Sequence, residues 1–123
     1  MSCACSTHTN RFAYACSGAA NTGLLADQAV RRLALQGGVR VTCLAAVGAE
    51  LEGFLKNARE AQLNLVVDGC PTACGHKTFQ RLGLPHTSLV LTDFGVEKGK
   101  TLVDEALIAS TVERLALSLP AQP

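Results

Sequence analysis

The sequence contains no tryptophan, and aromatic residues make up only 4% of its 123 residues. A hydrophobic core must therefore consist mainly of Leu, Val and Ala side chains. Hydrophobic residues make up 48% of the chain and charged residues 17%, which is the balance of a soluble globular protein. The length is that of one domain, and it is sufficient to bury a core without disulfide bonds or metal ions as structural supports.

The chain also has little net charge and no long apolar run. A formal charge of +1 gives no electrostatic signature of a protein that binds nucleic acid or an anionic membrane. No segment approaches the roughly 18 to 20 apolar residues that a membrane span requires. The segment from Met1 to His8 lacks the basic start and the apolar core of a signal peptide. We therefore expect a cytoplasmic protein with neither nucleic acid nor a membrane as its partner.

Six cysteines stand out against this composition. Disulfide bonds are uncommon in the reducing cytosol, and a chain of this size does not need them to fold. Clustered cysteines in such a protein more often bind metal or carry out redox chemistry. We therefore expect metal-binding or redox-active thiols.

Short β-rich runs alternate with helical patterns along the chain. The predicted strands cover residues 11–15, 39–46, 63–67 and 87–92, and the predicted helices cover 22–35, 50–62, 71–82 and 101–117. Thr101 and Asp104 have the spacing of a capping box at the start of the last helix. The near-continuous apolar strands predict an α/β fold with three layers, in which helices cover both faces of a four-stranded, mainly parallel sheet. Right-handed crossovers favour the strand order 2-1-3-4.

The same pattern predicts one domain with short ends. We expect a flexible N-terminal segment over residues 1–10, a single α/β domain over 11–119 and a tail over 120–123. No repeat and no linker divides the chain.

The most informative motif follows the third predicted strand. The apolar run from Leu63 to Val67 leads through Asp68 and Gly69 to Cys70, and Cys74 follows four residues later. Pro71 suits the first position of a helix, which would place Cys70 at or next to the N-cap. The free amides and the dipole of such a helix would favour the thiolate of Cys70.

Four cysteines fall at or towards the carboxyl ends of predicted strands, which are Cys16, Cys43, Cys70 and Cys74. Open α/β sheets bind ligands at this edge, and the order 2-1-3-4 makes the three strands concerned neighbours. Sulfurs that share one zinc ion at about 2.3 Å each must lie within about 4 Å of one another, which adjacent strand ends allow. Cys43 is alternatively a buried core thiol, and then three ligands and one open position remain.

Each of the other polar residues and cysteines near these thiols has two possible roles. Asp68 and Asp93 either cap their own loops or act as acidic neighbours of the thiols, behind the ligands or near a substrate. Cys3, Cys5 and His8 either belong to an incidental tail or supply an accessory ligand or resolving thiol. The segment Lys98-Gly99-Lys100 is predicted to be a solvated turn, with the anchoring of an anion as the alternative.

Several segments together are similar to the DGC-domain family, which is named after an Asp-Gly-Cys motif. They are Asp68-Gly69-Cys70-Pro71 with Cys74, the residues 16–23 (CSGAANTG), the residues 43–48 (CLAAVG) and the residues 91–96 (LTDFGV). The resemblance covers about residues 12–117 and keeps the order of the family's segments. It implies a zinc ion held by Cys16, Cys43, Cys70 and Cys74.

The sequence leaves three functional hypotheses. The first is a zinc-binding protein whose cysteine site has a structural, sensory or metal-assisted role. The second is a thiol enzyme for sulfur transfer or redox chemistry, with Cys70 as the nucleophile. The third is an iron–sulfur protein, because four cysteinates also suit a cluster. The sequence identifies no substrate, protein partner or oligomeric state.

Overall fold

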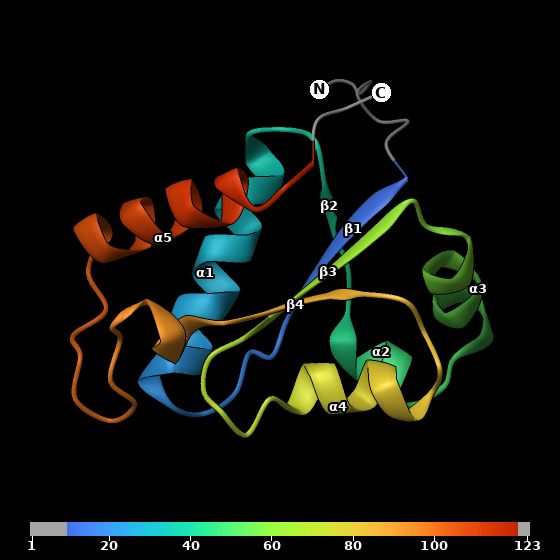
Figure 1. Cartoon of the computed structure of the whole chain (residues 1–123), viewed down its shortest axis with the longest axis horizontal. Helices are drawn as coiled ribbons and strands as arrows, with labels where there is room; N and C mark the ends of the chain where they lie inside the picture. The colour runs from blue at the N-terminus through green and yellow to red at the C-terminus, as the bar shows by residue number, and fades with distance from the viewer. Residues whose placement is uncertain (1–9, 121–123) are drawn as a thin grey trace.

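The structure, a computed structural model of the chain, describes residues 10–120. Its elements in chain order are β1 (Arg11–Ala15), α1 (Asn21–Leu35), β2 (Arg40–Val41), α2 (Leu44–Gly48), α3 (Glu52–Glu60), β3 (Leu63–Asp68), α4 (Cys74–Arg81), β4 (Thr87–Val90), the 3₁₀ helix η2 (Leu91–Phe94) and α5 (Glu105–Leu117). Figure 1 shows this arrangement. Cys3, Cys5 and His8, together with residues 121–123, lie outside the described residues.

The strands form one parallel sheet in the order β2-β1-β3-β4, which confirms the predicted fold and strand order. Strand β1 lies at the centre, pairing with β3 from Arg11↔Leu63 to Ala15↔Val67. The pairing of β1 with β2 is much shorter and contains only Phe12↔Arg40 and Ala13↔Val41. All carboxyl ends of the strands therefore meet at the same edge of the sheet.

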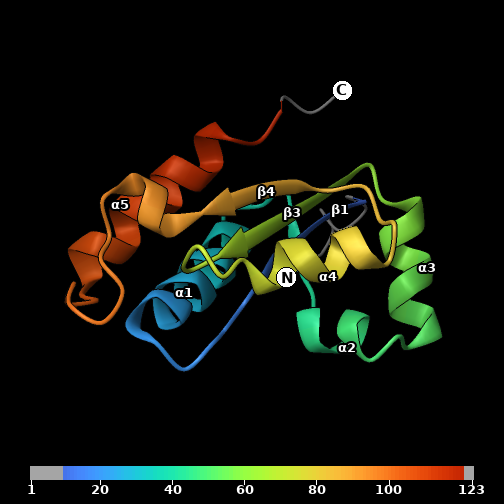
Figure 2. The same cartoon turned by 60° about the horizontal axis from the view of Figure 1, so that its bottom comes forward.

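Helices cover both faces of the sheet, as Figure 2 shows. Strand β3 alternates between the two cores: Leu65 and Val67 pack with α1 and α5, whereas Val66 packs with α2, α3 and α4. Tyr14 lies in the second core, where its hydroxyl donates to the side-chain oxygen of Asn64 at 2.8 Å. Because the sheet is buried on both sides, its central strands read as the continuous apolar runs seen in the sequence.

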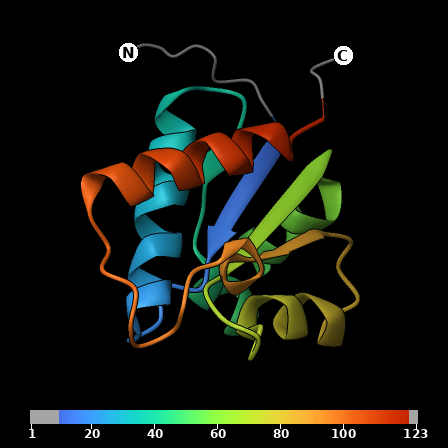
Figure 3. The ribbon, with the colours of Figure 1, turned by 60° about the vertical axis from the view of Figure 1, so that its left-hand side comes forward.

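On the first face, α5 crosses over α1, as Figure 3 shows most clearly. The guanidinium of Arg32 on α1 pairs with both carboxylate oxygens of Glu105 on α5 at 2.6 Å each. Asp104 caps α5 by accepting the amide of Leu107 at 2.9 Å. None of the helices within residues 10–120 is both long and apolar enough to cross a membrane.

Three predicted element boundaries are wrong by three residues or more. The second strand does not reach residue 46, because it ends at Val41 and the segment from Leu44 to Gly48 forms α2. Short apolar runs do not distinguish a strand from a buried helical turn, and two alanines favour the helix here. The last helix begins at Glu105 with Asp104 alone as its cap, so the predicted capping box with Thr101 does not form.

The third wrong boundary concerns the DGC motif itself. Helix α4 begins at Cys74, and Ala73 before it has a left-handed backbone with φ of 51°. Pro71 is therefore in a turn, which the hydrogen bond from the amide of Ala73 to the carbonyl of Cys70 closes at 3.0 Å. Cys70 is consequently not an N-cap residue, and the helix dipole does not act on its sulfur in the way that the sequence suggested.

The loops at the carboxyl edge pack backbone against backbone. A Cβ atom on Gly69 would lie 2.5 Å from the carbonyl carbon and oxygen of Thr22, at the start of α1. A Cβ atom on Gly23 would lie 2.4 Å from the carbonyl oxygen of Gly18. Only glycine allows these two approaches, so the chain after β3 is pressed against the start of α1.

We therefore expect Gly69→Ala to destabilise the protein. The added methyl group meets rigid backbone rather than a flexible side chain, and overpacking of this kind costs about 1–3 kcal/mol. Urea denaturation measures the free energy of unfolding. Gly53→Ala is the matched control, because a Cβ atom on Gly53 of α3 meets nothing within 4 Å. Equal unfolding free energies of the two variants would contradict the close packing described above.

Candidate functional site

Cys16 and Cys70 follow the ends of neighbouring strands and share one loop contact. Cys16 comes directly after β1, and its backbone amide donates to the carbonyl of Val67 in β3 at 3.1 Å. The backbone amide of Gly69 donates to the sulfur of Cys16 at 3.3 Å. Such a donor stabilises a negatively charged sulfur. The segment that carries Cys70 therefore also supports the sulfur of Cys16.

Cys70 has its own set of donors. Hydrogen bonds from the hydroxyl and then from the backbone amide of Thr72 lower the pKa of the Cys70 thiol below its ordinary value. The ammonium group of Lys98 adds a hydrogen bond and a favourable charge interaction, while partial burial opposes the shift. The lowered pKa raises the thiolate fraction of Cys70 at neutral pH, which favours both metal binding and nucleophilic reactivity.

Asn21 holds the loop that carries Lys98. Its side-chain amide donates to the carbonyls of Glu97 at 3.1 Å and Thr101 at 2.8 Å, and its side-chain oxygen accepts the amide of Gly99 at 2.6 Å. A residue at the first position of α1 thus fixes a loop almost eighty positions further along the chain. This loop brings a positive charge to the sulfur of Cys70.

Asp68 is fully buried and caps α4. Its two carboxylate oxygens accept the backbone amides of Gly75 at 2.7 Å and His76 at 2.9 Å. Asp68 therefore acts on the site by fixing the start of α4, where Cys74 stands. Asp93 lies in η2 and is exposed.

Cys43 and Cys74 are exposed, whereas Cys16 and Cys70 are half-buried. Cys43 directly precedes α2 and is thus neither in a strand nor in the core. Cys74 is the first residue of α4. Within residues 10–120, the structure brings no three His, Cys, Asp or Glu side chains together in an arrangement that could hold a metal ion.

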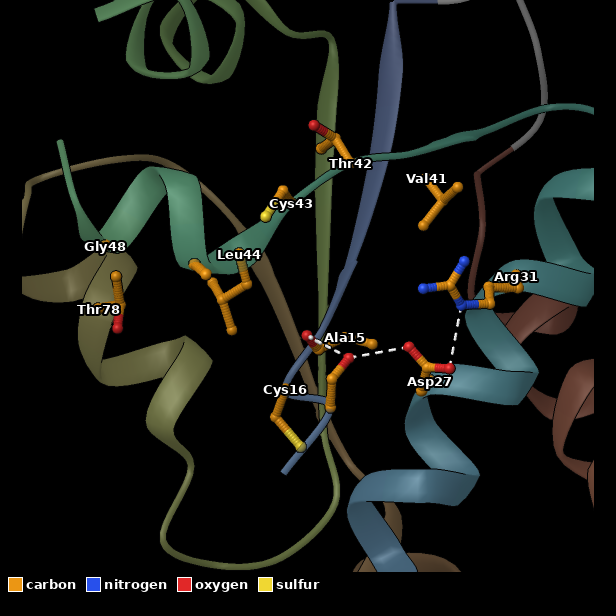
Figure 4. Close-up of a pocket in the computed structure, with 12 residues that line it drawn as sticks. Ala15, Cys16, Asp27, Arg31, Val41, Thr42, Cys43, Leu44, Gly48 and Thr78 are labelled. Carbon is orange, nitrogen blue, oxygen red and sulfur yellow. Dashed lines mark hydrogen bonds and ion pairs between the residues drawn. The ribbon is translucent and has the colours of Figure 1, made fainter. Parts of the chain in front are cut away.

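An open pocket of about 620 Å³ lies between α1 and α2, and both Cys16 and Cys43 line it. Figure 4 shows Asp27 and Arg31 of α1 on one wall, facing the segment from Thr42 to Leu44. Asp27 accepts a hydrogen bond from the Ser17 hydroxyl at 3.0 Å and pairs with Arg31 at 3.0 Å. The pocket gives solvent and small molecules access to the carboxyl edge beside two of the thiols.

Sequence reasoning missed the groups that act on Cys70. The sequence favours a solvated turn for Lys98 and offers the anchoring of an anion only as the alternative, and it predicts no role for Thr72 or Asn21. Thr72 lies two residues from Cys70, so the motif itself offered a local signal. Lys98 and Asn21 carry no such signal, because their roles arise from a contact between distant segments.

Comparison with known proteins agrees with this structure. The family model described as DGC domain matches residues 12–115. The chain is 32% identical over 107 residues to the anaerobic and virulence modulator AnvM of Pseudomonas aeruginosa, a match that covers 86% of this chain and 79% of AnvM. No solved structure matches the chain. The extent of the family match and its coincidence with the parallel sheet and its cysteine loops show that this chain belongs to the DGC-domain family.

Proposed function

We propose that this protein binds a thiophilic metal ion, zinc in the first place, through cysteine thiolates at the carboxyl edge of its sheet. One observation carries the proposal: the segment from Gly69 to Thr72 acts on both sulfurs, because the Gly69 amide donates to the Cys16 sulfur at 3.3 Å and Thr72 lowers the pKa of the Cys70 thiol. Zinc binds cysteine as the thiolate, so donors that stabilise the anion prepare these two sulfurs as ligands.

The donor chemistry of the edge fits zinc, but the described arrangement does not bring a full ligand set together. Cys16 and Cys70 form the supported pair, and Cys43 and Cys74 stand exposed near the same edge. Since no three donors converge within the described part of the chain, a closed site requires one or both exposed cysteines to move inward. Cys3, Cys5 and His8 are further candidate donors.

A sensory role fits this arrangement better than a purely structural one. The sheet lies between two hydrophobic cores built from apolar side chains of several elements, and a chain of this size can be held together by such burial. The name of AnvM describes a modulator of anaerobic behaviour and virulence, and a thiolate site responds readily to oxygen and oxidants. We place the protein in the cytoplasm, where its thiols would stay reduced.

Metal analysis of protein purified under anaerobic, reducing conditions tests the proposal. We expect about one zinc ion per chain, and Cys16→Ser or Cys70→Ser should remove it because each deletes one of the supported sulfurs. Zinc at about a hundred times its Kd should stabilise the fold by about 2.7 kcal/mol in thermal unfolding. Iron and inorganic sulfide are measured in the same samples.

Ser110→Ala is the control and should retain the zinc, because this exposed residue of α5 is not a candidate ligand. Cys5→Ser shows whether the N-terminal segment supplies a ligand. Cys43→Ser and Cys74→Ser then show which exposed cysteine completes the site. A wild-type protein that contains no zinc, and whose melting temperature does not change when zinc is added, would refute the proposal.

The environment of Cys70 favours a second candidate function, thiol chemistry with Cys70 as the nucleophile. Its sulfur is partly exposed and its pKa is lowered by Thr72 and Lys98, which are the properties of a reactive cysteine. Sulfur transfer and redox exchange both begin from such a thiolate.

The pH dependence of Cys70 alkylation tests this second candidate. Only the thiolate reacts with iodoacetamide, so the rate at Cys70 should reach half of its maximum below the ordinary thiol pKa. Thr72→Val removes the hydroxyl, the largest cause of the shift, and should move this midpoint upward and slow the reaction at pH 7 several-fold. Mass spectrometry identifies the modified residue.

Thr72→Ser is the control, because it keeps a hydroxyl at the same position. Its midpoint should stay close to that of the unmodified protein. Identical pH profiles for Thr72→Val and the parent chain would show that Thr72 does not stabilise the thiolate.

A further inference from the structure

Two histidines outside the thiol site face each other. His76 Nδ1 lies 2.8 Å from His86 Nε2, and the ring centroids are 5.0 Å apart with a tilt of 52°. His76 belongs to α4, and His86 lies in the loop directly before the edge strand β4. Both rings are half-buried, and nothing in the proposed thiolate function uses them.

A third contact determines where the protons are. His86 Nδ1 lies 3.0 Å from the carbonyl oxygen of Leu84, which can only accept a hydrogen bond. His86 Nδ1 therefore carries the hydrogen, and in the neutral ring Nε2 has a lone pair that faces His76. His76 Nδ1–H then donates to this lone pair.

This is the arrangement in which proteins prepare a histidine to bind a metal. A metal-ligating imidazole usually donates its other N–H to a carbonyl or carboxylate, which fixes the tautomer and the orientation of the ring. The fully buried ring of Phe79 also contacts the His86 ring, with centroids 5.3 Å apart. The lone pair of His86 is thus held in place by two independent contacts.

We propose that His76 Nδ1 and His86 Nε2 form a two-imidazole site for a borderline divalent cation such as Ni²⁺ or Zn²⁺. The cation would take the place of the hydrogen between the two nitrogens, and His76 would carry its hydrogen on Nε2 instead. Two nitrogens bound to one tetrahedral zinc ion at about 2.0–2.1 Å lie about 3.3 Å apart, so the rings need to separate by roughly half an ångström. Water completes the coordination shell, since no third side chain within residues 10–120 joins the pair.

The location of the pair permits access. His76 and His86 are both partly exposed to solvent, and His86 also lines an open pocket of about 250 Å³ with its exposed neighbours Pro85 and Thr87. The pair also uses imidazole donors only, which suit nickel and zinc, whereas the edge of the sheet presents thiols. The two sites can therefore be tested separately in the same chain.

The test is a calorimetric titration with Ni²⁺ of the full chain that carries Cys16→Ser and Cys70→Ser. This background removes the supported thiol pair, and it should still bind about one equivalent of Ni²⁺ per chain. Adding His76→Asn should weaken binding by about tenfold or more. An asparagine amide can donate the same hydrogen bond to His86 Nε2, so a merely structural role of His76 would be preserved.

Gln80→Ala in the same background is the control, because it changes an exposed side chain of the same helix outside the histidine pair and should leave the affinity unchanged. In the parent background, NMR of ¹⁵N-labelled histidines should show that Ni²⁺ perturbs the ring signals of His76 and His86 and not those of His8. Melting temperatures verify that each variant is folded.

Unchanged affinity in the His76→Asn variant, or no Ni²⁺ binding in the parent background, would overturn the inference. This result is independent of the thiolate proposal, which is tested by whether the wild-type protein contains zinc and whether Cys16→Ser or Cys70→Ser removes it. Zinc-free wild-type protein together with histidine-dependent Ni²⁺ binding would refute the first and support the second.

Discussion

The close approach of Gly69 to the start of α1 is the constraint on which the arrangement of the site depends. The missing side chain lets the segment after β3 lie directly against Thr22, and this contact places the Gly69 amide within 3.3 Å of the Cys16 sulfur. The same approach positions Cys70, one residue later, near the loop that Asn21 holds. A bulkier residue at position 69 would move both supported sulfurs at once. The glycine of the Asp-Gly-Cys motif is therefore explained by backbone packing and not by chain flexibility.

The buried carboxylate of Asp68 at the start of α4 explains why the Cys70 thiolate depends on donors other than the amides of this helix. Asp68 already places a buried carboxylate at the first free amides of this helix. A second anion at the same helix end would meet repulsion from Asp68 and find these amides already occupied. The sulfur of Cys70 is instead stabilised by Thr72 and Lys98, which lie on its own turn and on the loop 97–101. The motif thus combines a helix cap and a thiolate site, with separate hydrogen-bond donors for each anion.

The sequence was sufficient for the parts of the fold that follow from general rules of chain connection. Parallel strands joined by right-handed crossovers, with continuous apolar runs, predict the order 2-1-3-4, and the structure has this order. Boundaries that depend on distant contacts could not be predicted in this way. The start of α4 is set by Asp68, whose carboxylate accepts the backbone amides of Gly75 and His76. These two hydrogen bonds outweigh the local preference of Pro71 for a first helical position. Lys98 and the histidine pair likewise acquire their roles only from the folded structure.

The two exposed cysteines, Cys43 and Cys74, differ in the hydrogen bonds that would break if they moved towards Cys16 and Cys70. Cys74 is attached to the end of α4, and shifting that end would strain two charge-assisted hydrogen bonds to Asp68, each worth about 1.5–3 kcal/mol. Cys43 precedes a helix of only five residues, and its carbonyl accepts a single neutral hydrogen bond at 3.3 Å, which is worth about 1 kcal/mol. The chain before it is held by the two residue pairs of β2 and by one neutral hydrogen bond from the Thr42 amide to the Ala13 carbonyl at 3.0 Å. Cys43 is therefore the thiol that can approach Cys16 and Cys70 at the lower cost, and the pocket between α1 and α2 gives it the space to do so.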